Sequence, residues 1–104
     1  MGLTNFRCFN LSRQLYRECL GLDLPPHLRS QIDRAASSIA LNLAEGLGRS
    51  SHKDQRHFFA MALGSTKEVQ AILALSPATP PALEDLADHL GASLFRLCKA
   101  PPPR

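Results

Sequence analysis

The histidines and cysteines are the residues best suited to metal or nucleophilic chemistry, but their spacing suits neither. His52 and His57 are five positions apart, so they do not share a helix face as metal ligands at i and i+4 do. No HExxH motif occurs, and Cys8, Cys19 and Cys98 are widely spaced without a CxxC pair. We therefore predict no metal site and no disulfide framework.

The segment GLGRSS, residues 46–51, has a superficial likeness to a phosphate-binding loop. It lacks the GxxxxGK[ST] spacing, and a predicted helix precedes it where a phosphate loop follows a strand. Asp54 and His57 could pair across one helical turn, but no nucleophile accompanies them. We interpret the segment as a turn between helices, and we predict that the protein is not an enzyme and uses no cofactor.

Four segments with helical periodicity must position any functional side chain. They run from Thr4 or Asn5 to about Leu20, and over residues 26–45, 51–76 and 81–99. Short connections with proline or glycine separate them, and no strand pattern appears. We predict an all-α fold, an antiparallel up-down-up-down four-helix bundle in which residues 1–100 form a single domain and residues 101–104 a disordered tail.

Local signals mark the turn between the second and third helices. Gly46 and Gly48 are expected to adopt the left-handed conformation that ends a helix. Ser51 with Asp54 three residues later is typical of a helix start, because the serine side chain can accept a free backbone N–H.

The third helix carries more apolar residues than one stripe requires. Gly64 lies in its interior, at a cost of about 1 kcal/mol relative to alanine. We expect close approach of a neighbouring backbone at Ala60 and Gly64 to offset that cost. Phe59 and Leu63 are expected to lie off the stripe that faces the core. The residues expected on that stripe are Phe58, Met61, Ala62, Ser65, Val69, Ile72 and Leu75.

The second helix is apolar or small on nearly every side over residues 35–44, a pattern typical of a buried helix. A single bundle of 104 residues has too little material to cover it. Leu41, Phe59 and Leu63 add large side chains to this surplus. The sequence therefore predicts that the bundle associates with copies of itself.

In such a bundle the start of the first helix, the second turn and the end of the fourth helix meet at one end. We call this end the basic pole. It holds eight basic residues against the acidic Glu45 and Asp54, a formal charge of +6, whereas the rest of the chain sums to −3. The free N–H groups that start the third helix add to a phosphate-binding surface. The alternative is a solvated surface that compensates helix dipoles. The basic residues are Arg7, Arg13, Arg49, Lys53, Arg56, Arg96, Lys99 and Arg104.

Aromatic residues are scarce at the basic pole. Phe6 and Phe9 are near it, and we assign both to the core. Any binding is therefore expected to follow backbone charge or shape more than base sequence.

Four polar residues interrupt the apolar stripes: Arg34, Asn42, Glu45 and Glu68. We predict a buried polar network in which Arg34 faces Glu68 on the adjacent helix. Such a network fixes helix register more than it adds stability.

The sequence also carries signals about location. No apolar run reaches the roughly 18 residues of a membrane span. No basic segment followed by an apolar run is visible at the N-terminus, so no signal peptide is predicted. With three unpaired cysteines, these features favour a reduced, cytoplasmic protein.

The stretch QIDRAASSIALNLAEGLGRSSHKDQRHFFAMALGSTKEV, residues 31–69, resembles a known family. Its members are small four-helix bundle proteins encoded in intervening sequences of bacterial large-subunit ribosomal RNA genes. The first motif is matched by Gln31, Arg34, Ala35, Ala36, Ser38, Ile39, Asn42, Ala44, Glu45, Gly46, Gly48 and Arg49. The second is matched by Phe58, Ala62, Gly64, Ser65 and Glu68. Asp33 departs from the pattern, where a basic residue is common.

The resemblance implies a four-helix bundle that assembles as a homopentameric ring. A related branch, the accessory variability determinants of diversity-generating retroelements, binds nucleic acid and a reverse transcriptase through a basic barrel of this kind.

Two functions remain open from the sequence. The first is a non-enzymatic ring that binds structured RNA or DNA through Arg49, Lys53 and Arg56, with Arg96 and Lys99 in support. The alternative is a protein-interaction scaffold, an accessory subunit of a reverse transcriptase or another nucleic-acid enzyme.

Overall fold

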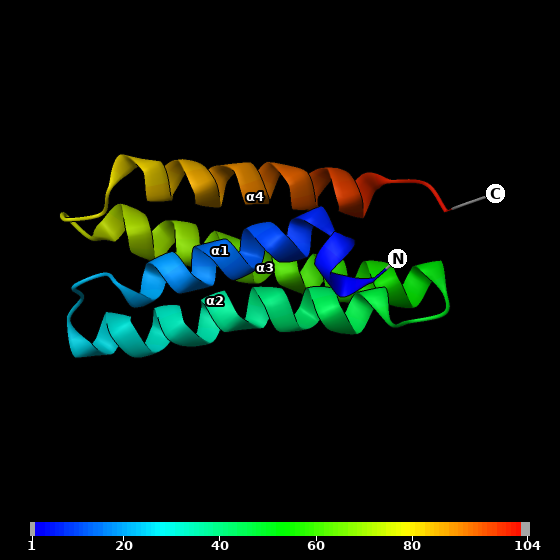
Figure 1. Ribbon diagram of the computed structural model, residues 1–104, viewed down its shortest axis with the longest axis horizontal. Coiled ribbons are helices and arrows are strands. Elements are labelled where there is room, and N and C mark those ends of the chain that lie inside the picture. The colour runs from blue at the N-terminus through cyan, green and yellow to red at the C-terminus, as the bar shows by residue number, and fades with distance from the viewer. Residues whose placement is uncertain (1, 103–104) are drawn as a thin grey trace.

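Four α-helices make up most of the chain in the computed structural model, which describes residues 2–102. After a short 3-10 turn, η1 (Leu3–Asn5), come α1 (Arg7–Leu20), α2 (Pro26–Leu47), α3 (His52–Leu75) and α4 (Pro81–Lys99). Each helix runs opposite to the one before it, and residues 2–102 contain no strand (Figure 1). The predicted all-α four-helix bundle is therefore confirmed. Arg104 and the end of the predicted tail lie outside the described residues.

The helices begin where proline or serine can supply a start. Pro26 and Pro81 are the first residues of α2 and α4, where a missing N–H costs no helical bond. The Ser51 hydroxyl accepts the backbone N–H of Asp54 at 3.1 Å, as predicted. The predicted capping of α1 is wrong, because its N-cap is Phe6, which makes no side-chain cap.

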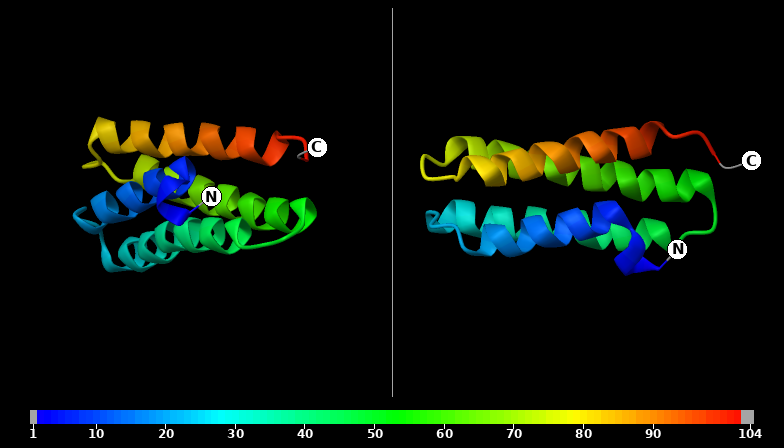
Figure 2. Two further views of the ribbon diagram at one scale, coloured as in Figure 1. Left: turned by 45° about the vertical axis from the view of Figure 1, so that its right-hand side comes forward. Right: turned by 45° about the horizontal axis from the view of Figure 1, so that its top comes forward.

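Adjacent helices along the chain pack side by side, and α4 closes the bundle against α1. Figure 2 shows α1 beside α2 and α3 beside α4, and α2 packs most extensively on α3. The bundle is 46 Å long and about 20 Å across. Its fully buried large side chains are mostly aliphatic: Leu15, Ile32, Ile39, Leu43, Val69, Leu73, Leu90 and Leu94.

Gly46 lies inside α2 and is buried, so the prediction that it ends the helix is wrong. The helix continues to Leu47, and Gly48 caps it with a φ of −80°, a right-handed conformation. A Cβ added at Gly46 would lie 2.7 Å from a ring carbon of Phe59. The missing side chain therefore makes room for that ring, which also packs on Phe6 at a centroid distance of 5.8 Å.

The predicted stripe of α3 is confirmed at Ala62, Val69 and Ile72, which are buried, but it is wrong at other positions. Phe59 is in the core, although it was expected off the stripe. Phe58 is only half-buried, and Met61 and Leu75 are exposed. At Gly64, no atom of residues 2–102 lies within 4 Å of the place that a Cβ would occupy. The predicted close approach of a backbone at Gly64 is therefore absent among residues 2–102, and the tight contact lies instead at Gly46, with a side chain.

We expect the same substitution at the two glycines to have opposite effects. Gly46→Ala forces the Phe59 ring to move, and overpacking of this kind costs about 1–3 kcal/mol. Gly64→Ala meets no atom and gains helix propensity, so the isolated bundle becomes more stable by about 1 kcal/mol. Urea unfolding of the wild type and both variants under monomeric conditions measures the difference. Equal effects at the two sites would contradict this packing.

Arg29 ties the end of α1 to the start of α2. Its guanidinium donates to the carbonyl oxygens of Cys19 and Leu22, each at 2.8 Å. It also pairs with Asp33 at 2.6 Å. Asp33, the departure from the family pattern, thus holds the arginine that satisfies two carbonyls at the C-terminal end of α1.

Cys19 makes the stability of the bundle sensitive to alkaline pH. Burial raises the pKa of its thiol from 9.0 to about 11. Because the folded pKa is the higher one, this contribution to stability is complete below about pH 9 and is lost as the pH rises toward 11. Each pKa unit corresponds to about 1.4 kcal/mol. The free energy of unfolding of the wild type should therefore fall between pH 8 and pH 10.5, and that of Cys19→Ala should fall less over the same range. An equal fall in the two proteins would contradict this prediction.

Candidate nucleic-acid interface

The end of α4 and the first turns of α3 bring cations together around Cys98. Burial raises the pKa of the Cys98 thiol, and the positive charges of Arg56 and Lys99 act to lower it. Arg56 of α3 therefore lies close enough to the last turn of α4 to influence a group there. Two of the predicted basic residues meet at this point.

The start of α1 contributes to the same region. Burial raises the pKa of Cys8, while the charges of Arg7 and Arg96 lower it and Cys98 raises it. The start of α1 and the last turns of α4 thus each bring an arginine near Cys8. Three helices together place Arg56, Arg96 and Lys99 near one end of the bundle, with Arg7 reaching from the start of α1 to His89 midway along α4.

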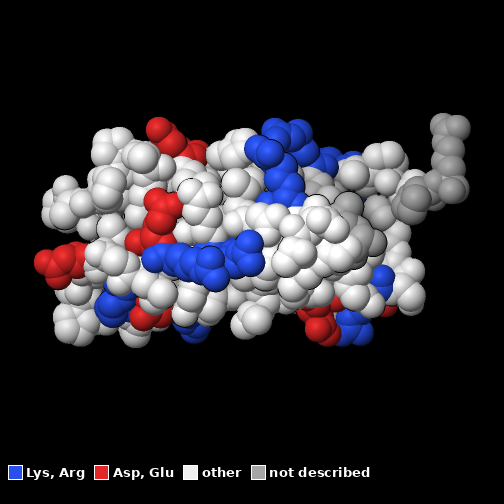
Figure 3. All heavy atoms as spheres, in the orientation of Figure 1, with Lys and Arg blue, Asp and Glu red and all other residues white. Residues whose placement is uncertain are grey.

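The surface reflects this arrangement. In Figure 3, Lys and Arg atoms gather right of centre at the top, over the last turns of α4 and the start of α1. Acidic atoms are spread over the left half, where α4 begins, and basic atoms lie among them at the centre and lower left. A smaller mixed group of basic and acidic atoms lies at the lower right, over the end of α2.

The predicted basic residues differ in whether their charge is paired within the chain. Lys53 and Arg56 are exposed and make no hydrogen bond or ion pair with residues 2–102. Arg49 pairs with Glu45 at 2.6 Å, and its guanidinium lies 4.7 Å from the centroid of the Phe58 ring. Arg49 is therefore partly neutralised, and it is a weaker candidate phosphate ligand than its neighbours on α3.

Two other arginines have neutral partners. Arg7 Nη2 lies 2.9 Å from Nε2 of His89, and Arg96 donates to the Ser93 hydroxyl at 3.3 Å. Both keep their charge unpaired by any carboxylate among residues 2–102. Arg13, by contrast, lies midway along α1 and lines a groove against α2, so it does not belong to the basic pole.

The N-terminus of α3 lies within the basic pole. The Asp54 N–H is already bonded to Ser51, which leaves the N–H groups of His52 and Lys53 without a partner among the backbone and side-chain bonds of residues 2–102. The ring nitrogen Nε2 of His52 is buried, and it too lacks a partner within that range. The helix dipole and these donors favour an anion here.

The expectation that no aromatic residue is available at this end is wrong. Phe6 is indeed in the core, and Phe9 is half-buried. However, Phe95 on the penultimate turn of α4 is 53% exposed. Lys99 Nζ lies 5.4 Å from the centroid of its ring.

The polar residues of the second helix form separate contacts and not one buried network. Arg34 does face Glu68, at 2.9 Å, but both side chains are substantially exposed, so the pair adds at most about 1 kcal/mol. Asn42 donates to Ser38, whose hydroxyl also accepts from Ser65 of α3 at 3.1 Å. Glu45 pairs with Arg49 in the turn that follows α2. The register-fixing bonds between α2 and α3 are therefore the serine pair and the Arg34–Glu68 pair.

A second surface is apolar and uncovered. Leu41 of α2 is 68% exposed, and the outer side of α3 from Ala60 onward is small or apolar except at Lys67. An 18-residue window of α3 has the length and average composition of a membrane span, with 33% of it buried, but Lys67 and Glu68 interrupt it, so it is not an unbroken apolar run. The exposed small or apolar residues of α3 are Ala60, Met61, Gly64, Ala71, Ala74 and Leu75.

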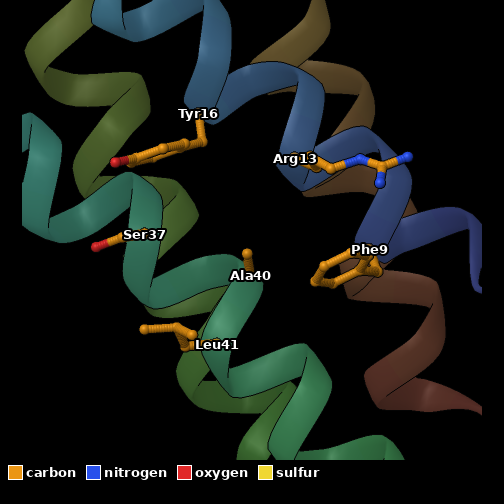
Figure 4. Close-up of a pocket in the computed structure, with 6 residues that line it drawn as sticks. All are labelled: Phe9, Arg13, Tyr16, Ser37, Ala40 and Leu41. Carbon is orange, nitrogen blue, oxygen red and sulfur yellow. The ribbon is translucent and has the colours of Figure 1, made fainter. Parts of the chain in front are cut away.

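An apolar groove between α1 and α2 adjoins Leu41. Its volume is about 190 Å³, and Figure 4 shows side chains of both helices around it. Almost all of its wall is carbon, with Arg13 at its edge. The lining residues are Phe9, Arg13, Tyr16, Ser37, Ala40 and Leu41.

Comparison with known proteins agrees with the resemblance seen in the motifs. A search of curated proteins gave no match. The family model of the 23S rRNA-intervening sequence proteins matches residues 5–99, which includes all four helices. This bundle therefore belongs to the 23S rRNA-intervening sequence protein family.

Proposed function

We propose that the protein is a non-enzymatic, ring-forming bundle of the cytoplasm that binds structured RNA or DNA through the basic pole. The observation that carries this proposal is the meeting of Arg7, Arg56, Arg96 and Lys99, drawn from three helices, near one end of the bundle. Lys53 extends the same surface, and Arg49 contributes less because of its pairing with Glu45.

Dipole compensation explains only part of this charge. Arg96 and Lys99 lie at a helix C-terminus, where positive charge is favourable. Arg7, Lys53 and Arg56 lie in the first turns of α1 and α3, where a positive charge opposes the dipole at a cost of about 0.3–1 kcal/mol each. A polyanionic ligand gives a reason for cations at unfavourable positions, since each phosphate contact releases bound counterions.

The uncovered apolar face supports self-association. The groove beside exposed Leu41 is concave and lies between α1 and α2, whereas exposed Met61 and the open side of Gly64 belong to α3, so the two apolar surfaces are unlike each other. Unlike surfaces that join head to tail generate rings when the rotation closes. We take five copies from the family resemblance, and a ring of parallel copies would align the basic poles on one side.

A second candidate function follows from the same apolar face. If another protein covers Leu41 and Met61 instead of a second copy, the bundle is an accessory subunit of a reverse transcriptase or other nucleic-acid enzyme. In that case the isolated protein is a monomer and has little affinity for nucleic acid of its own.

Arg56→Ala and Arg17→Ala form a matched pair that tests the proposal. Both arginines are exposed, helical and free of ion pairs among residues 2–102, but only Arg56 lies at the basic pole. For a structured RNA hairpin, we expect Arg56→Ala to weaken binding and to reduce the slope of log K against log salt by about one for each phosphate that is no longer bound. Arg17→Ala should leave the slope unchanged. Identical slopes for both variants would reject the basic pole as the interface, and no binding by the wild type would favour the accessory-subunit function.

A further inference from the structure

Phe95 is an aromatic side chain that the bundle does not use for its own core. The buried residues of α4 are Leu83, Ala87, Leu90, Ser93 and Leu94, which leaves the Phe95 ring on the outer side of the helix. More than half of its surface is exposed. Isolated apolar residues on a surface are common, so the surroundings of the ring decide whether it has a role.

Those surroundings are cationic. Lys99, one turn further along α4, places Nζ 5.4 Å from the ring centroid. Arg96 follows Phe95 directly and is exposed. Arg56 of α3 acts on Cys98, which lies one turn after Phe95 on the same helix. The ring therefore lies beside Lys99 and next in sequence to Arg96, and Arg56 adds positive charge near the same turn of α4.

We propose that Phe95 is a stacking platform for an unpaired nucleobase, with Lys99 and Arg56 placed to bind the adjoining phosphates. This inference rests on the proposed function and deepens it, because it assigns a preference for single-stranded segments such as loops or overhangs. A base in a duplex has both faces covered by its neighbours, whereas an unpaired base offers a free face. Every base has such a face, so the contact tolerates any sequence.

The charges argue against a second copy as the occupant. A protein surface seated on Phe95 would also cover Lys99 and Arg56, and burying unpaired cations is costly. A nucleotide brings an aromatic ring and a phosphate together, so it satisfies the ring and the cations at once.

The test measures the affinity of Phe95→Leu, Phe95→Tyr and the control Leu20→Ala for two RNA probes of equal length. One probe is an unpaired RNA of mixed sequence, and the other is a blunt RNA duplex. Leu20 is 52% exposed at the far end of α1 and matches Phe95 in exposure. We expect Phe95→Leu to weaken binding of the unpaired probe by roughly 5- to 150-fold while duplex binding stays the same. Phe95→Tyr should retain wild-type binding, because its ring still stacks.

The outcomes separate this inference from the proposed function. If Phe95→Leu binds the unpaired RNA like the wild type while Arg56→Ala weakens binding, the stacking site is wrong and the basic pole stands. If neither substitution has an effect, the basic pole is also wrong. If Phe95→Leu changes the mass of the assembly measured by light scattering, Phe95 is covered by a second copy and the stacking proposal fails.

Discussion

Leu41→Glu is expected to convert an assembled protein into a folded monomer. In a single chain the Leu41 side chain is 68% exposed, so a carboxylate at this position remains in water and does not disturb the bundle. Between copies the same carboxylate would be buried beside an apolar groove whose one charged lining residue, Arg13, lies at its edge, so its desolvation should cost several kcal/mol for each interface. Light scattering at micromolar concentration measures the mass, and circular dichroism confirms that the helices remain.

Leu20→Glu is the matched control for this prediction. Leu20 is also a largely exposed leucine, but it lies at the C-terminal end of α1, away from Leu41 and the groove. We expect this variant to keep the wild-type mass. An assembly that survives Leu41→Glu would exclude this face as the interface, and a monomeric wild type would exclude the ring.

Removing four cations at once is expected to abolish most of the affinity for nucleic acid. At a slope of about −0.9 per phosphate contact, each contact contributes nearly tenfold at about 0.1 M salt. The variant Lys53→Ala/Arg56→Ala/Arg96→Ala/Lys99→Ala should therefore bind structured RNA on the order of a thousandfold more weakly than the wild type. Fluorescence anisotropy with a labelled hairpin measures the change.

The same variant should fold at least as well at the start of α3. Lys53 and Arg56 oppose the dipole of that helix, so their removal relieves a small unfavourable interaction. Arg17→Ala/Lys67→Ala serves as the control, because it removes exposed cations from outside the basic pole. Equal affinity of the pole variant and this control would show that the affinity does not come from the basic pole.

The helices could be predicted because their signals are local. Prolines begin α2 and α4, Ser51 caps α3, and each signal acts within one turn of the residue that carries it. The buried face of α3 could not be predicted in this way. Phe59 turns inward because Gly46, on another helix, leaves space for its ring, and such a contact across the bundle has no local signature.

The basic pole could be predicted from topology, because alternating helix directions bring α1, α3 and α4 together at one end. Whether each cation is free or paired with a carboxylate does not follow from topology. The Glu45–Arg49 pair has the i, i+4 spacing that is visible in the sequence, and it marks Arg49 as partly neutralised. Phe95 was also within reach, since the seven-residue spacing of Leu83 and Leu90 along α4 marks a buried face that does not include it. That Glu45 and Asn42 belong to separate contacts could be learned only from the side-chain hydrogen bonds and ion pairs of the structure.

The most direct test of the central claim is the salt dependence of RNA binding by the wild-type protein. With Arg7, Arg56, Arg96 and Lys99 near one end, we predict a slope of log K against log salt of about −4 or steeper for a structured hairpin. A slope near zero would contradict the account, because it would mean that the gathered cations make no contact with phosphate.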